Sequence, residues 1–158
     1  MFHIVLVAPQ SPQNTGNIAR TCAVTGGKLH LVKPLGFDIS ERSVRRAGLD
    51  YWDKVFVDVY EDFAQLQTAY PTAPFYLVET VGSRRYDQVT YPPGAFLVFG
   101  QETKGLPQEI VRQYPETLIR LPMREGLRSL NLSNAVAVAT SEALRQQGYC
   151  GLGDSAGA

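Results

Sequence analysis

The chain has 158 residues, with 15 basic and 15 acidic side chains and therefore no formal net charge. That length fits one domain of the usual ~100–200 residues, and a hydrophobic content of 44% is enough for one ordinary core. The longest apolar run is far shorter than the ~20 residues that a membrane helix needs. Zero net charge also argues mildly against bulk electrostatic binding of nucleic acid, which normally shows as a basic domain.

The N-terminus enters a strand-like run at once and has no basic region, so we expect no signal peptide. The two cysteines, Cys22 and Cys150, lie far apart and have no ligand-like companions. We expect Cys22 to be a small buried hydrophobe, and the protein to be reduced, cytoplasmic and free of metal. One domain is expected over residues 2–149, followed by a flexible tail over 150–158.

Short apolar and β-branched runs alternate with helical segments along the chain. Strands are predicted at 2–8, 29–33, 55–59, 75–79, 96–99 and 117–121. Helices are predicted at 15–25, 40–48, 61–70, 107–114 and 133–148. Several of the strands are almost continuously apolar, which is typical of strands buried on both faces of a parallel sheet. The pattern predicts a single α/β domain with a mostly parallel sheet of about six strands.

Polar and glycine residues mark the ends of these predicted helices. Asn14 and Thr15 are predicted to cap the first helix, and Ser40 the second. Pro107 suits the first helical position of the fourth helix. Gly148 suits the residue after the last helix, where a left-handed backbone is common.

Three patches of small polar and glycine residues, at 9–20, 99–107 and 129–135, each adjoin a predicted strand or open a predicted helix. Glycine lets the main chain come close to a ligand, and Asn, Ser and Thr cap helix ends. Together the patches indicate a small-molecule site built largely from backbone groups. Taken singly, the second patch fits a plain strand-to-helix turn, and the third fits an ordinary core helix.

The order of these patches and the residues within them resemble those of the SPOUT ribose methyltransferases, trefoil-knotted enzymes that use S-adenosylmethionine. The likeness is carried by Asn14, Gly16, Asn17, Arg20, Gly100, Glu102, Gly105, Leu106, Pro107, Arg128, Ser129, Asn131, Leu132, Ser133, Asn134 and Ala135. The segment 45–51 resembles in particular the YibK-like type, which methylates the 2′-OH of the tRNA wobble nucleotide. The resemblance spans about residues 2–149.

This resemblance implies a deep trefoil knot near the C-terminus, with S-adenosylmethionine in the knotted loops and no metal. The residues implied to hold the cofactor, mostly by backbone contacts, are Val78, Gly100, Glu102, Gly105, Leu121, Ser129, Leu130 and Asn131. Apolar side chains at Val78 and Leu121 suit the flat face of adenine, because such pockets are mostly apolar with few polar groups.

The first patch is implied to carry the catalytic residues Asn14, Asn17 and Arg20. Asn17 and Arg20 are three apart and share a helix face; by spacing alone, Arg20 fits a surface charge equally well. The resemblance places Arg20 beside the ribose. A guanidinium with a pKa above ~12 is a poor base, so our hypothesis is that Arg20 stabilises the developing alkoxide and grips a phosphate. Glu102 fits three roles: it binds backbone amides, balances Arg20, or caps a helix.

RNA contacts are expected from cations and aromatic rings. The candidates are Arg42, Arg45, Arg46, Tyr51 and Arg128, although solvated loops have the same composition. The resemblance implies a homodimer through the first and last helices, and as substrate a tRNA, a leucine tRNA in particular, with cytidine or a modified uridine at position 34. Ser141 stands where relatives commonly have tyrosine, which leaves the target nucleotide open. The alternatives are methylation of ribosomal RNA and a catalytically silent RNA-binding module.

Overall fold

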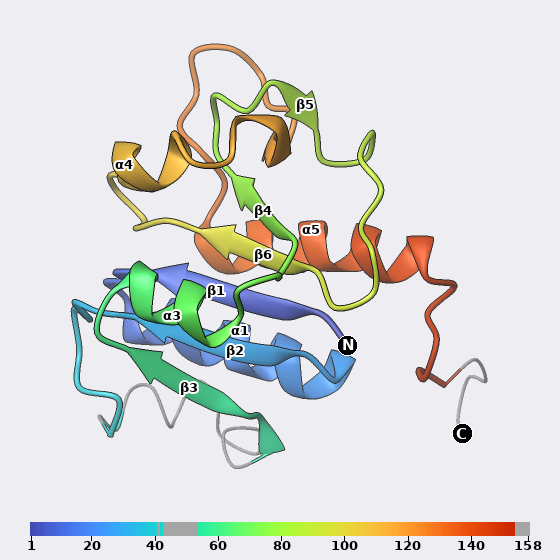
Figure 1. Ribbon diagram of the computed structural model, residues 1–158. Helices are drawn as coiled ribbons and strands as arrows, with labels where there is room; N and C mark the ends of the chain where they lie inside the picture. Colours follow the sequence, from blue (N-terminus) through green and yellow to red (C-terminus); the bar gives the residue numbers. More distant parts are fainter. Residues whose placement is uncertain (41, 43–53, 154–158) are drawn as a thin grey trace.

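A seven-stranded sheet forms the centre of the computed structural model, which describes residues 1–40, 42 and 54–153 (Figure 1). The strands are β1 His3–Val7, β2 Lys28–Val32, β3 Val57–Tyr60, β4 Phe75–Val78, β5 Arg84–Arg85, β6 Phe96–Phe99 and β7 Leu118–Arg120. Their order across the sheet is β3-β2-β1-β6-β4-β7-β5, and all of these neighbours pair in parallel. The predicted α/β class with a parallel sheet is confirmed.

The predicted strand count was one too low. The strand that sequence reasoning missed is β5, which consists of Arg84 and Arg85 alone and pairs with the end of β7. Two charged residues give no apolar run and no alternation, so the sequence carries no local signal for this strand. The predicted helix at 40–48 falls almost entirely outside the described residues.

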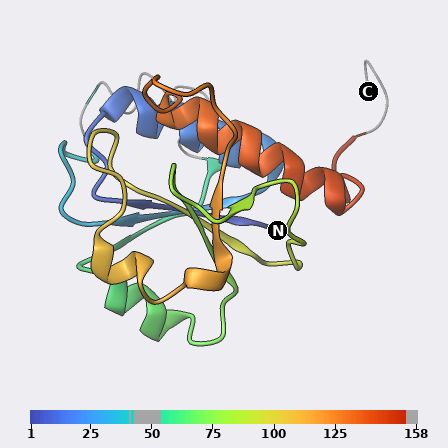
Figure 2. The same ribbon diagram turned by 90° about the horizontal axis from the view of Figure 1, so that it is seen from above.

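Helices cover both faces of the sheet (Figure 2). On one face lie α1 Pro12–Thr25 and α5 Leu132–Gln146, which contact each other. On the other lie α3 Phe63–Ala69 and the short α4 Gln108–Val111, with a 3-10 turn, η2 Pro115–Thr117, before β7. Successive residues of a strand point to opposite faces. Ile4 and Leu6 of β1 therefore pack with the α1 and α5 side chains, and Val5 and Val7 with those of α3 and α4.

The ends of the two long helices follow local chemistry, with one correction. Ser11 caps α1, because its Oγ accepts a hydrogen bond from Asn14 N at 3.1 Å. The prediction that Asn14 and Thr15 cap this helix was wrong: the helix begins at Pro12, whose ring suits the first turn. Gly148 follows α5 with φ +64°, as predicted.

Cys22 is completely buried on α1, as predicted. Burial raises the pKa of its thiol to about 12, so the group stays neutral in the core. In the described part of the chain, no helix combines the length and the hydropathy needed to cross a membrane.

Strand β7 is inserted between β4 and β5, although β4 and β5 follow each other in the chain. Gly82, in the β4–β5 connection, lies so close to β7 that an added Cβ would stand 2.3 Å from the carbonyl carbon of Ile119. The α5 residue Gln146 then bonds to the β5–β6 connection, accepting from Tyr91 N at 2.9 Å and donating to the Val89 carbonyl at 2.8 Å. Strand β7 therefore lies between two strands that precede it in the chain, and α5 is held against the β5–β6 connection; the knot itself stays a prediction from the resemblance.

Candidate functional site

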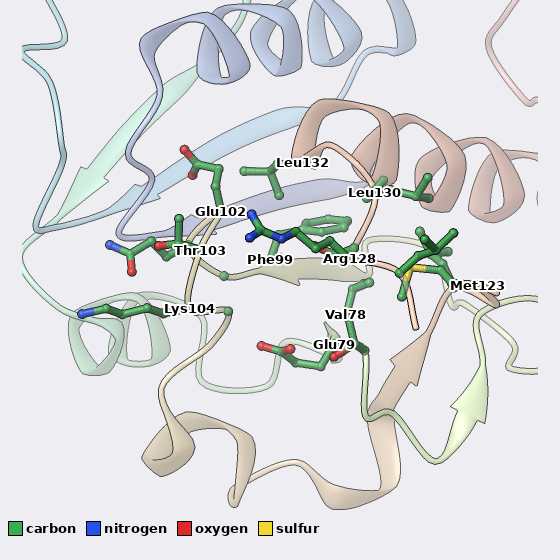
Figure 3. A pocket seen from close by; sticks show the side chains of 18 residues that line it. Val78, Glu79, Phe99, Glu102, Thr103, Lys104, Met123, Arg128, Leu130 and Leu132 are labelled. Atoms are coloured by element: carbon green, nitrogen blue, oxygen red, sulfur yellow. The ribbon is translucent and has the colours of Figure 1, made fainter. Parts of the chain in front are cut away.

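A pocket of about 680 Å³ opens at the carboxyl ends of β4, β6 and β7. Parallel α/β sheets bind ligands at this edge, where loops leave the strands. Figure 3 shows side chains from the end of β4, the loop after β6 and the loop after β7 around one space. The lining residues are Val78, Glu79, Thr80, Phe99, Gly100, Gln101, Glu102, Thr103, Lys104, Gly105, Leu121, Met123, Leu127, Arg128, Ser129, Leu130, Leu132 and Ala135.

The loop after β6 is a tight reversal made possible by two glycines. Gln101 and Gly105 bond to each other through both main-chain pairs, at 2.9 and 3.2 Å. A Cβ on Gly100 would lie 2.2 Å from the carbonyl carbon of Gly105, and Gly105 itself has φ +69°. Neither position tolerates a side chain without backbone movement. The glycines of the second patch therefore shape the pocket wall, which a plain strand-to-helix turn does not require.

Two carboxylates hold this loop through main-chain amides. Glu79, the residue after β4, accepts a hydrogen bond from Leu106 N, and its Oε1 would lie 2.6 Å from a Cβ on Gly105. Glu102 accepts from Gln10 N and from Ser11 N, the latter at 2.6 Å. These contacts bear out one of the roles considered for Glu102, the binding of backbone amides at a helix start.

The loop after β7 supplies the third wall. Leu121 is buried at its start, whereas residues 122–131 are exposed. Ser129 and Leu130 line the pocket. Asn131 is not among the lining residues; it caps α5, accepting from Ser133 N at 2.9 Å. Seven of the eight residues predicted to bind the cofactor thus share one cavity, and Asn131 stands at its edge as a helix cap.

The predicted catalytic residues lie on α1, outside the pocket lining. Asn14 is partly exposed in the first turn, and Asn17 and Arg20 are exposed further along the helix. Arg20 follows Asn17 by three residues, so both project from one side of α1. Helix α1 is capped by Ser11, whose amide is bound by Glu102 of the pocket wall. Their catalytic roles stay predictions.

The predicted RNA-binding residues are less fully described. Arg42 is exposed. Arg128 lines the pocket, and its side chain extends into the same space as Glu102 in Figure 3. Arg45, Arg46 and Tyr51 lie outside the described residues.

Several lining residues were missed by sequence reasoning. Glu79 had a usable signal, since an acidic residue follows a buried strand directly. Lys104 stands within the second patch, between Gly100 and Gly105, but its residue type alone does not distinguish it from a surface lysine. Met123 and Leu127 are exposed apolar residues in the loop after β7. Nothing local distinguishes them from ordinary loop residues, so only the fold brings them to the pocket.

The described geometry defines a class of protein: an α/β domain with a cavity large enough for a nucleotide-sized ligand at the carboxyl edge of its sheet. The cavity volume falls within the ~300–1,000 Å³ usual for small-molecule sites. Its walls combine apolar side chains, such as Val78 and Leu121, with glycine backbone and carboxylates. Among the described residues, no group of three or more His, Cys, Asp or Glu side chains is arranged to hold a metal ion.

Comparison with known proteins identifies the family. Residues 1–141 match the model of the SpoU rRNA methylase family, and the chain belongs to this family. The tRNA (cytidine(34)-2′-O)-methyltransferase of Burkholderia ambifaria is 47% identical over 96% of this chain and 99% of its own length. A protein of the same name from Methylovorus glucosotrophus is 47% identical with the same coverage of both chains.

Solved structures of related methyltransferases support the same family assignment. One from a study of "2-OH methylation of C/U34 on tRNA" superposes with a TM-score of 0.90 at 41% identity, covering 94% of this chain and 97% of its own. An AdoMet-bound rRNA methyltransferase from Sinorhizobium meliloti superposes with a TM-score of 0.82 at 27% identity; the match covers 91% of this chain and 56% of that one. The fold is therefore that of a SpoU methyltransferase, as the resemblance of the three patches implied.

Proposed function

We propose that this protein transfers a methyl group from S-adenosylmethionine to the ribose 2′-OH of the wobble nucleotide, position 34, of a tRNA. The observation that carries the proposal is the convergence of the second and third patches on one pocket at the carboxyl edge of the sheet. Relatives that match nearly end to end and bear this activity in their names support it.

The pocket fits the cofactor in size and chemistry. Val78 and Leu121 offer apolar surface for the adenine ring, and the backbone of Gly100, Gly105, Ser129 and Leu130 offers donors and acceptors near it. The charged side chains of the walls balance, because Glu79 and Glu102 are matched by Lys104 and Arg128. When bound, the cofactor supplies an electrophilic methyl group.

Residues of α1 are proposed to act on the RNA. Arg20 stabilises the alkoxide that develops on the 2′ oxygen and holds an adjacent phosphate, since a guanidinium offers several N–H donors and a positive charge. Asn14 and Asn17 orient the ribose by hydrogen bonds. The contribution of the protein is mainly positioning, because two reacting atoms held at roughly 3–3.5 Å react far faster than free partners.

The remaining parts of the proposal concern partners. Arg42, Arg45, Arg46, Tyr51 and Arg128 bind the tRNA, with a leucine tRNA as the substrate, and a cytoplasmic location follows from that substrate. A homodimer through α1 and α5 would bring two such surfaces together. Support comes from the position of these helices side by side on one face and from exposed valines on both, Val24 and Val138. Sedimentation of the protein tests the dimer.

Mass spectrometry of RNA from a strain lacking the gene is the deciding test. We expect the 2′-O-methylated nucleoside at position 34 of one tRNA group to disappear and to return when the purified enzyme and S-adenosylmethionine are added. Loss of a methylated nucleoside from ribosomal RNA instead would support the alternative substrate. Failure of the purified protein to bind S-adenosylmethionine at millimolar concentration would favour a silent RNA-binding module.

The role of Arg20 is tested separately with Arg20→Lys and Arg20→Ala. Removal of one charge-stabilising donor costs about 100- to 1,000-fold in kcat, so we expect a loss of this order for Arg20→Ala with unchanged cofactor affinity. Wild-type turnover with lysine would show that the planar guanidinium is not needed.

A further inference from the structure

The segment 8–11, between β1 and α1, is held in an unusual conformation. Ala8 has φ +54°, a left-handed backbone that residues with a side chain rarely adopt. Ala8 N donates to the Val32 carbonyl at 2.8 Å, and Gly36 N donates to the Pro9 carbonyl at 2.9 Å. A Cβ on Gly36 would stand 2.8 Å from Cα of Gln10. One side of this segment is therefore fixed by the chain that follows β2.

The other side of segment 8–11 is fixed by the pocket loop. Gln10 N lies 3.0 and 3.1 Å from the two carboxylate oxygens of Glu102, and Ser11 N lies 2.6 Å from Oε2. Thr103 adds a side-chain bond from its Oγ1 to Oε1 of Gln10 at 3.0 Å. Bonds from amides to an ionised carboxylate are about twice as strong as neutral ones. They join residues 91 and 92 positions apart in the chain.

These bonds continue into the helix that carries the proposed catalytic residues. Ser11 is the residue whose amide Glu102 binds, and its own Oγ caps the amide of Asn14 at 3.1 Å. Glu102 also lines the pocket. A direct sequence of contacts therefore runs from the pocket wall through Ser11 to the first turn of α1.

We propose that Glu102 is a positioning residue, which sets the place of α1 relative to the cofactor pocket through the amides of Gln10 and Ser11. This inference rests on the proposed function in one respect, namely that Arg20 and the asparagines of α1 meet the ribose. A ligand that orders the loop over 100–105 also fixes the start of α1, and binding of ligand and RNA is coupled. Such coupling is reciprocal for binding free energies.

Amide hydrogen exchange tests the contact without any RNA. In the 15N-labelled wild type, we expect S-adenosylhomocysteine to slow exchange at Gln10 and Ser11. Glu102→Ala removes both acceptors and should speed exchange at these amides at least about tenfold, the equivalent of one hydrogen bond to a charged group. Glu102→Gln keeps one acceptor oxygen and should fall between the two.

Glu79→Gln is the matched control. It alters a carboxylate in the same pocket that binds the amide of Leu106 rather than the start of α1. We expect it to leave exchange at Gln10 and Ser11 at the wild-type rate. Equal effects of the Glu79 and Glu102 variants on these amides would overturn the inference, as would unchanged exchange in Glu102→Ala.

Kinetics separate positioning from a purely structural role. We expect kcat for tRNA methylation to fall about 10- to 100-fold in Glu102→Ala, the cost of misplacing reacting groups by about 1 Å. We also expect the presence of tRNA to tighten S-adenosylhomocysteine binding in the wild type and not in this variant. A purely structural defect would lower the thermal midpoint and weaken the binding of both S-adenosylhomocysteine and tRNA. It would not change the factor by which tRNA tightens S-adenosylhomocysteine binding.

The two levels of proposal fail differently. A wild-type protein that methylates no tRNA would overturn the proposed function and leave the exchange result intact. A wild-type protein that methylates tRNA, together with a Glu102→Ala variant of unchanged kcat and coupling, would overturn the role of Glu102 alone.

Discussion

Polar groups lie around an open pocket at one edge of the sheet and are paired with one another at the other edge. At the carboxyl edge, the pocket is walled by glycine backbone and by carboxylates that bind amides. At the amino edge, on the face covered by α3, polar side chains pair with one another. We call this group, together with the Phe96 ring that stacks on it, the amino-edge cluster; its polar members are His3, Lys28, His30, Asp58, Tyr60 and Tyr70.

Contacts within the amino-edge cluster are short and continuous. His3 Nδ1 lies 2.9 Å from His30 Nε2, and His30 Nδ1 lies 3.0 Å from the Tyr60 hydroxyl. The His3 ring stacks on Phe96 with centroids 4.0 Å apart. Lys28 bridges Asp58 at 2.7 Å. The polar atoms named here are used within the protein, whereas the carboxyl edge leaves a cavity large enough for a ligand. The comparison therefore assigns stability to one edge and binding to the other.

The largest expected effect tests this assignment with two glycine variants. Gly100→Ala places a methyl group 2.2 Å from the Gly105 carbonyl carbon, so the loop must shift. Overpacking of this kind costs about 1–3 kcal/mol or more of unfolding free energy. We also expect S-adenosylhomocysteine binding to fall below detection in calorimetry, because the displaced loop is a pocket wall.

Gly94→Ala is the counterpart at the amino edge, just before β6. Its φ is +80° but nothing lies within 4 Å of an added Cβ, so the cost is backbone strain of about 1–2 kcal/mol. Ligand affinity should change less than about twofold, as expected for distant sites. Comparable loss of affinity in both variants would break the division between the two edges.

The next effect in size is the pH dependence of stability, which belongs to the amino-edge cluster. Burial lowers the pKa of His3 from 6.5 to about 4 and that of His30 from 6.5 to about 3; nearby positive charge on Lys28, and for His30 also its neighbour His3, contributes. The unfolded chain therefore binds more protons below pH 6.5. Above pH 6.5 the histidines are neutral in both states and do not lower the free energy of unfolding. As the pH falls from 6.5 toward 4, protonation of the unfolded chain lowers that free energy.

Denaturant titrations at several pH values measure this effect. We expect the two histidines together to cost about 2–3 kcal/mol of unfolding free energy between about pH 7 and 5, because each proton bound only by the unfolded chain costs ~1.4 kcal/mol per pH unit below 6.5 and His3 is only partly buried. The double variant His3→Phe/His30→Phe keeps aromatic packing and cannot titrate, so its profile should be flatter. Identical profiles for the two proteins would contradict the assignment to these rings.

Much of the fold was predictable because its signals are local. The apolar run of β6, all four residues of which are buried, is typical of a strand with helices on both sides. Strand β5 was not predictable, since Arg84 and Arg85 pair with β7 through backbone alone. The start of α1 was misplaced by three residues, because Ser11 and Asn14 are both good caps and only the structure shows which amide is bound.

The site was predictable in part for the same reason. Gly100 and Gly105 marked the pocket because a tight reversal requires such residues. The partners of Glu102 could not be inferred, since Gln10 and Ser11 lie more than 90 positions away and no local pattern encodes the contact. A trefoil knot violates the usual rules of chain topology. It was expected only by resemblance.

The smallest expected effect concerns Asn131 and tests whether this residue is only a helix cap or also binds the cofactor. Asn131 caps α5 through Ser133 N, and Asp62 caps α3 in the same way through Gln65 N at 2.8 Å. Loss of either cap by alanine substitution should cost about 1 kcal/mol of unfolding free energy. Aspartate at 131 should restore the cap, since it accepts the same bond.

Binding of S-adenosylhomocysteine then decides what Asn131 does beyond capping. If Asn131 only caps the helix, Asn131→Ala and Asp62→Ala should lower stability equally. Both variants should then have the same dissociation constant for S-adenosylhomocysteine. If Asn131 also holds the cofactor, as the family resemblance implies, Asn131→Ala should weaken binding well beyond Asp62→Ala at the same loss of stability. Ser129 and Leu130 line the pocket. The two variants therefore decide whether the cofactor site ends at Leu130 or includes Asn131.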